Sequence, residues 1–208
     1  MAYSEFTLRK VRQDLGVHIQ EGGRFLGEIP PILPDELLRQ ELDEGVPLVL
    51  ARGSEKARSE WIINPVLTAV RRLLDRQVSL FSGDDFTVDP TIGLNGICDF
   101  VISKSPTQLE IEAPAIIIIE AKKENLNGGL GQCIAEMVGA QIFNQTNGKS
   151  ISTIYGSVTS GTAWKFLKLE SKTVTIDLTE YPLPPVEQIL AMLIWMIQNG
   201  SEKIEDKT

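Results

Sequence analysis

The sequence predicts an α/β protein in which a central mixed β-sheet is flanked by helices. Segments of strand length and segments of helix length follow one another along the chain. The isoleucine run 116–119 is apolar on both faces, which is typical of a central strand covered on both sides. With 208 residues and no internal repeat, the chain is long enough for one domain with a sizeable core.

The first 50 residues are expected to form an N-terminal extension packed on the core of a domain formed by residues 51–208. Within the extension, residues 4–16 could form a short helix and residues 20–34 a loop. Asp35–Glu44 predicts a helix that ends at Gly45, because glycine often follows the last turn of a helix. A short apolar segment follows at residues 48–50.

The segment from Ser54 to Asp75 predicts two helical stretches. The first runs to Ile63, and Asn64-Pro65 then supplies an N-cap and a proline at the first helical position. Either a second helix or a kinked continuation reaches Asp75.

The remaining elements follow from short β-rich runs separated by turns and from two further helical segments. Strands are expected at 78–81, 86–88, 96–103, 115–122, 152–158, 162–169 and 173–178, with helices at 128–144 and 185–198. The last helix is apolar around nearly its whole circumference from Ile189 to Ile197, so it must be buried. Completion of its own domain is favoured; an interface in a homodimer or with a partner subunit is the alternative.

Charge and composition restrict the function. The formal charge of −8 argues against a constitutive DNA-binding module. Residues 52–76 carry six basic and three acidic side chains, so this region either faces a polyanion or is a solvated helix face. His18 is the only histidine, and Cys98 and Cys133 are the only cysteines, which disfavours zinc sites, disulfides and Ser-His-Asp triads. With neither signal-like nor membrane-spanning segments, a cytoplasmic protein without membrane contact is expected.

The residues that point most clearly to a catalytic function are Glu120-Ala121-Lys122, where the isoleucine strand ends. Because side chains alternate along a strand, Glu120 and Lys122 should lie on one face together with Ile116. A second strand carries one acid, Asp99, which strand pairing could bring beside Glu120. Charged groups at the end of a buried strand need a metal, a counter-charge or water.

Such a group suits phosphodiester hydrolysis. The carboxylates of Asp99 and Glu120 and the backbone carbonyl of Ala121 are oxygen ligands of the kind Mg²⁺ prefers. The metal would activate a bound water, and Lys122 would orient it or neutralise developing charge. A Glu-x-Lys triplet is more often a solvated strand end or a salt bridge; the buried run, the acid in the preceding strand and the following helix favour a site here.

These residues resemble the PD-(D/E)XK nucleases, and the sequence is especially similar to the N-terminal nuclease domains of type I restriction subunits. The resemblance covers about residues 54–170 and rests on Ser59-Glu60-Trp61, Asn64-Pro65-Val66-Leu67, Gly96-Ile97-Cys98-Asp99, Glu120-Ala121-Lys122 and Gly131-Gln132-Cys133. It implies a restriction-endonuclease-like fold and Mg²⁺-dependent cleavage of DNA or RNA, with Mn²⁺ as a substitute. One departure is Cys98, where the family often has proline.

The resemblance adds two residues to the expected site. Glu60, on the early helix, would join the metal ligands, although a surface glutamate is its ordinary explanation. Gln132, on the helix after the lysine strand, would join the catalytic group, with Glu136 one turn further on the same face. Surface exposure of Gln132 is an equally open alternative.

Two other function classes remain open. The first is a catalytically inactive nuclease-fold protein that acts as an interaction or scaffolding domain, which need not bind Mg²⁺ through Asp99 and Glu120. The second is glycoside hydrolysis by paired carboxylates. Lys122 and the low aromatic content, 6% of residues, favour phosphate over sugar.

Overall fold

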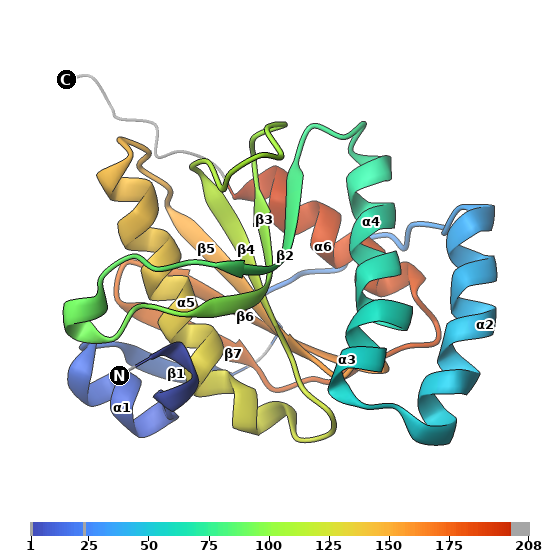
Figure 1. Cartoon of the computed structure of the whole chain (residues 1–208), viewed down its shortest axis with the longest axis horizontal. Helices are drawn as coiled ribbons and strands as arrows, with labels where there is room; N and C mark the ends of the chain where they lie inside the picture. The colour runs from blue at the N-terminus through green and yellow to red at the C-terminus, as the bar shows by residue number, and fades with distance from the viewer. Residues whose placement is uncertain (1, 23, 201–208) are drawn as a thin grey trace.

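An eight-stranded mixed sheet, flanked by helices, forms the centre of the protein (Figure 1). The computed structural model describes residues 2–22 and 24–200. The strand order is β1-β7-β6-β5-β4-β3-β2, and β8 pairs with β6 at the side of this path. The predicted α/β class with a mixed sheet is therefore confirmed. The strands are β1 (His18–Gly22), β2 (Ser79–Asp85), β3 (Ile97–Ser103), β4 (Ala115–Ala121), β5 (Thr153–Thr159), β6 (Ala163–Glu170), β7 (Thr173–Asp177) and β8 (Tyr181–Pro182).

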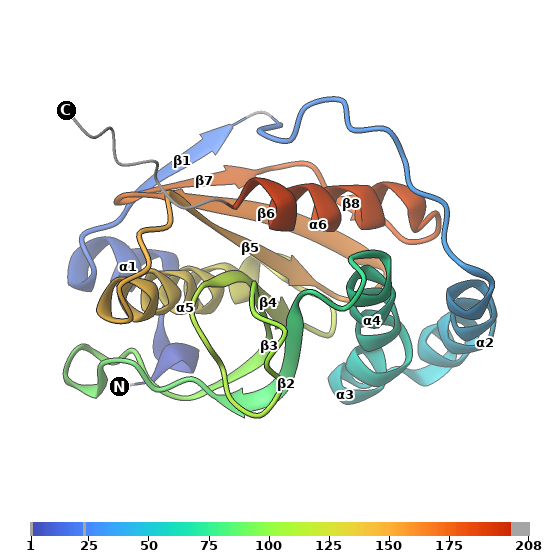
Figure 2. The same ribbon diagram turned by 90° about the horizontal axis from the view of Figure 1, so that it is seen from above.

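The helices cover both faces of the sheet (Figure 2). On one face lie α1 (Leu8–Asp14) and α5 (Leu126–Thr146); on the other lie α4 (Asn64–Leu73) and α6 (Glu187–Asn199), with α2 (Glu36–Arg52) outside α4. Two hydrophobic clusters, one on each face, form the core. β4 is buried along its whole length, as the isoleucine run predicts for a central strand.

The pairing of β4 explains why α5 crosses the sheet. β4 runs antiparallel to β3 but parallel to β5. A parallel pair needs a long crossover connection, and α5 provides it. The N-terminal end of α5 consequently lies near the C-terminal end of β4, where the Glu-x-Lys triplet is found.

A bulge in β4 changes which side chains share a face. Ile102 pairs with Ile117 and Ser103 with Ala115, so Ile116 is the extra residue of β4. Ile116 packs with Ile117 on the α4 and α6 side of the sheet. The expectation that Ile116 shares the face of Glu120 is therefore wrong, because the bulge interrupts the alternation.

α2 does not end at Gly45. It continues through Gly45 and Pro47 to Arg52. A Cβ atom on Gly45 would lie 2.4 Å from the backbone oxygen of Trp61, so glycine here permits a close helix contact rather than a helix end. The short apolar segment expected at residues 48–50 is the last part of this helix.

The segment from 55 to 73 is a continuous run with an irregular centre. It consists of α3 (Glu55–Arg58), a π-helical turn (Ser59–Ile63) and α4. Asn64 therefore does not cap a separate helix, and the kinked continuation is the alternative that the structure supports. A π-helical turn holds one more residue than an α-helical turn, so it rotates all preceding side chains relative to α4.

Residues 2–22 form part of the folded domain. A 3₁₀ turn (Tyr3–Glu5) and α1 lie against α5, where Cβ atoms on Gly131 and Gly139 would collide with Phe6 and Tyr3 respectively. β1 pairs in parallel with β7, and its last residues, 20–22, lie in the segment that was expected to be a loop. The N-terminal segment thus supplies an edge strand as well as packing on the core.

α6 is buried within this chain. Its apolar side chains join the core cluster on the α4 side, as the favoured alternative predicts. This surface is therefore taken up by the protein's own core, and the structure gives no support to a homodimer or partner subunit bound through it. None of the helices in residues 2–22 and 24–200 is both long enough and apolar enough to cross a membrane.

Candidate functional site

The candidate site lies where β3 and β4 separate. Their last paired residues at this end are Phe100 and Ile119. Beyond them, Asp99 Oδ2 accepts a hydrogen bond from the backbone N–H of Ala121 at 2.7 Å. The carboxylate thus takes the place that a strand carbonyl would have in a continued ladder, which fixes Asp99 beside the end of β4.

Glu120 occupies the centre of the site. Its side chain points to the α5 side of the sheet and is only 1% exposed. Lys122 Nζ forms an ion pair with Oε1, and Gln132 Nε2 donates a hydrogen bond to Oε2 at 2.9 Å. Asp99 also interacts with Glu120. The structure therefore brings together Asp99, Glu120, Lys122 and Gln132.

Gln132 points into the site rather than to the surface. Its Nε2 atom also donates to Glu136 Oε1 at 3.0 Å, one turn further along α5. Glu136 is fully buried, and its Oε2 atom has no hydrogen-bond partner among the described residues. Gln132 thereby links an acid at the end of β4 to a second acid in the core.

Burial dominates the protonation of these acids. Burial first, and then the charge of Asp99, raise the pKa of Glu120 to about 8, and Lys122 opposes this rise. Burial likewise raises the pKa of Asp99, against the hydrogen bond from Ala121. The pKa of Glu136 is far above its ordinary range because of burial and then the charge of Glu120. The cluster holds more carboxyl groups than cations, so protons or an added cation must balance it.

Lys122 remains charged at neutral pH. Burial acts to lower its pKa, but the nearby carboxylates, Glu120 first, raise the pKa above its ordinary value. The carbon chain of Lys122 packs against the first turn of α5, where a Cβ atom on Gly129 would lie 3.1 Å from both Cγ and Cε of Lys122. The helix therefore guides the ammonium group toward Glu120.

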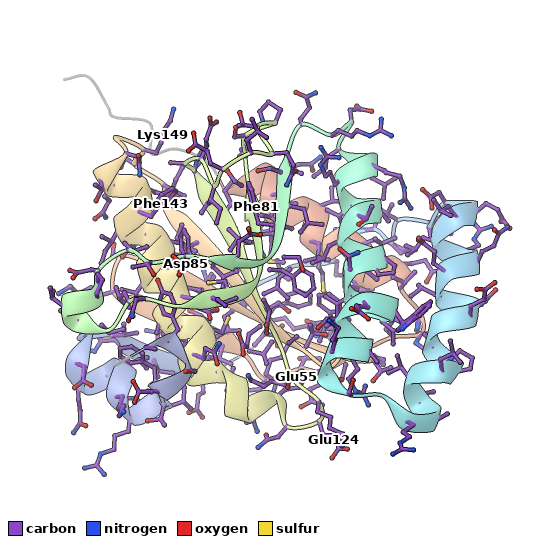
Figure 3. All side chains as sticks on the ribbon, viewed as in Figure 1. Glu55, Phe81, Asp85, Glu124, Phe143 and Lys149 are labelled. Carbon is purple, nitrogen blue, oxygen red and sulfur yellow. The ribbon has the colours of Figure 1, made fainter. Side chains whose placement is uncertain are left out.

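Glu60, which the resemblance adds to the metal ligands, lies at the surface of the protein. Glu60 forms an ion pair with Lys56 at 3.4 Å, and 56% of its side chain is exposed. The helical acid whose charge acts on Asp99, Glu120 and Lys122 is instead Glu55. Glu55 belongs to the first turn of α3, at the end of the sheet that also carries Glu124 (Figure 3).

One sequence signal, an N-cap serine, places Glu55 at the start of a helix. Ser54 precedes it, and the Ser54 hydroxyl accepts a hydrogen bond from the backbone N–H of Ala57 as an N-cap. An N-cap places the next residue at a helix N-terminus, the end that here faces the site. The motif match instead selected Glu60, five positions later and beyond the start of the π-helical turn.

The donor set fits a hard cation with few protein ligands. Within the described ranges, no group of three or more histidine, cysteine, aspartate or glutamate side chains is arranged to hold a metal ion. Mg²⁺, however, keeps several waters and is commonly held by one or two carboxylates. Asp99, Glu120 and the carbonyl of Ala121 offer oxygen ligands of this kind. The thiols of Cys98 and Cys133 are buried, and burial raises both pKa values, so neither is a ready thiolate ligand.

Comparison of the chain with protein-family models and with curated proteins finds no match.

Proposed function

We propose that the protein is a metal-dependent nuclease that hydrolyses phosphodiester bonds of DNA or RNA. The observation that carries this proposal is the convergence of two carboxylates and one lysine, Asp99, Glu120 and Lys122, at the point where two central strands separate. The resemblance of the same residues to the PD-(D/E)XK motif supports it. The order of a helix, strands and a crossover helix, which the resemblance implies, is a further support.

Mg²⁺, with Mn²⁺ as a substitute, is the proposed cofactor. Asp99, Glu120 and the carbonyl of Ala121 would hold it, and the bound ion would polarise a phosphate oxygen and acidify a water molecule. The raised pKa of Glu120 suits this assignment, because a cation offsets the repulsion between two neighbouring carboxylates. Cation binding near neutral pH should therefore release a proton.

The other side chains have distinct proposed tasks. Lys122 rests against Glu120 Oε1, and its partly exposed side chain can turn toward the attacking water or the phosphate. There its charge would stabilise the negative charge that develops during hydrolysis. Gln132 holds Glu120 Oε2, which fixes the carboxylate plane. Glu60 is exposed and paired with Lys56, so the proposal gives it no direct contact with the reacting atoms.

The decisive experiment combines Mn²⁺ binding with cleavage. Asp99→Asn should lose both Mn²⁺ binding, measured by isothermal titration calorimetry, and cleavage of DNA and RNA at low salt. Lys122→Met should retain Mn²⁺ binding but lose cleavage, because its proposed task concerns the transition state. Glu60→Gln is a control that should leave both intact. Full cleavage by Lys122→Met would refute the assigned mechanism.

A catalytically inactive scaffolding domain is the second candidate, and one observation favours it. The acids already have protein partners: Lys122 pairs with Glu120, and the Ala121 N–H binds Asp99. The cluster could thus be a purely structural network. Under this alternative, wild-type protein would bind no Mn²⁺ and cleave no nucleic acid, and Asp99→Asn and Lys122→Met would both lower the melting temperature.

A further inference from the structure

A second lysine, Lys165, lies on the same face of the sheet as the candidate site. In the strand register, Glu120 on β4 pairs with Val158 on β5, and Val158 pairs with Lys165 on β6. Paired residues point to the same face of a sheet. Lys165 is therefore two strands away from Glu120, about 10 Å at the usual strand spacing.

The ammonium group of Lys165 lies beside the first turn of α5. Its Nζ atom donates a hydrogen bond to Asn127 Oδ1 at 3.0 Å. Lys122 contacts the same turn at Gly129, and Val158 lies beneath it. The beginning of α5 is thus flanked by two lysines, one paired with the carboxylate of the candidate site and one directed to the helix.

Lys165 is a buried lysine whose carboxylate partner lies at the surface. Its side chain is only 6% exposed, and its carboxylate partner is Glu180 at 3.4 Å, whose side chain is 56% exposed. A buried ammonium is costly unless it is well paired. The distance to Glu180 is longer than the 2.7–2.9 Å typical of charge-assisted hydrogen bonds. Glu180 is therefore a loose, solvent-facing partner that another anion can replace.

We propose that Lys165 and Asn127 bind a backbone phosphate of the nucleic-acid strand, next to the phosphate cleaved at Glu120 and Lys122. Glu180 covers the ammonium group in the free protein and moves aside when the phosphate binds. This inference rests on the proposed nuclease function. It explains how a chain with a formal charge of −8 holds a polyanion near an acidic centre. Such a contact positions the strand without reading its sequence.

The test measures binding of a short fluorescent single-stranded oligonucleotide without divalent metal, by anisotropy over a series of salt concentrations. Lys165→Met should weaken binding about tenfold at low salt, because it removes a charged hydrogen-bond donor. It should also reduce the slope of log K against log salt by about 0.7, the value for one lost phosphate contact on a single strand. Glu180→Gln should tighten binding, since it removes the competing carboxylate.

The salt slope separates binding from structure, because loss of a purely structural lysine would change the melting temperature but not the slope. If Lys165→Met does not fold, Glu180→Gln decides, because this exposed side chain can be replaced without disturbing the core. Unchanged affinity in Lys165→Met, or in Glu180→Gln if Lys165→Met does not fold, would overturn the inference.

The outcomes also separate the phosphate site from the nuclease function. If the variants behave as expected but wild type cleaves nothing with Mn²⁺, the nuclease function fails and the phosphate site stands. If wild type cleaves but binds no more weakly after Lys165→Met, only the phosphate site fails. Absence of both binding and cleavage in wild type would overturn both.

Discussion

Gly129 and Gly128 are adjacent on α5, yet alanine at the two positions should have opposite effects. A Cβ atom on Gly129 would lie 2.8 Å from Val158 Cγ1 and 3.1 Å from Cγ and Cε of Lys122. Val158 is fully buried on β5, and a β-branched side chain has little freedom to turn away. On Gly128, the nearest atom is Asn125 Nδ2 at 3.4 Å, which is an ordinary contact.

The expected free energies follow from two competing terms. Replacing glycine by alanine within a helix stabilises it by up to about 1 kcal/mol. Overpacking a well-filled core costs roughly 1–3 kcal/mol. Gly129→Ala should therefore lower the free energy of unfolding by about 1–2 kcal/mol, and Gly128→Ala should raise it by a fraction of 1 kcal/mol. For a domain of this size, the first change corresponds to a fall in melting temperature of roughly 2–8 °C.

Activity provides the second readout. The new methyl group of Gly129→Ala would push the carbon chain of Lys122 and separate its ammonium from Glu120. Cleavage should consequently fall well below that of Gly128→Ala at a temperature where both variants are folded. Urea unfolding and calorimetry measure the stabilities, and a fluorescent oligonucleotide measures cleavage. Equal stability and equal cleavage in the two variants would refute the packing argument.

Two further predictions concern charge at the site. Glu120 has an ordinary pKa of 4.5 when unfolded and a pKa of about 8 when folded, so between these values the folded state keeps a proton that the unfolded state has lost. Its contribution to stability is therefore fully present below pH 4.5 and falls by up to about 1.4 kcal/mol per pH unit until pH 8. Glu120→Gln should flatten this part of the curve in urea unfolding, and an unchanged slope would contradict the assignment. Glu55→Gln should lower the pKa of Glu120 by a few tenths of a pH unit, on the order expected for removing one nearby charge, whereas Glu60→Gln should not. NMR titration of the Glu120 carboxyl can measure both, and an equal shift in the two variants would contradict the placement of Glu55.

The strand that carries the chemistry was predictable because two local signals agree. The isoleucine run predicts a strand buried on both faces, and the charged residues at its end mark an edge of the sheet where polar groups can meet. The structure has both features. The alternation of side chains along this strand predicts the wrong face for Ile116. The reason is a bulge, which depends on the pairing of β4 with β3 and has no pattern of its own in the sequence.

Other features depend on tertiary contacts, so local sequence patterns do not predict them. Gly45 has the local signature of a helix end, but its neighbour in the fold is the backbone of Trp61 on a different helix. The surface position of Glu60 was not predictable for a similar reason. A π-helical turn after Arg58 alters the rotation of α3 relative to α4, and the motif resemblance that selected Glu60 contains no signal for such a turn.

The pairing of β1 with β7 has a consequence for how the protein reaches its final state. His18 pairs with Thr173 and Gly22 with Asp177, so most of the other helices and strands lie between β1 and its partner strand in the sequence. Contacts between residues so distant in sequence require closure of a long loop and form slowly. The backbone groups at the β7 edge of the sheet therefore remain unpaired until β1 binds there. An unpaired edge can pair with a strand of another chain. During synthesis β1 is made before β7, so it has to wait for its partner strand before it can pair.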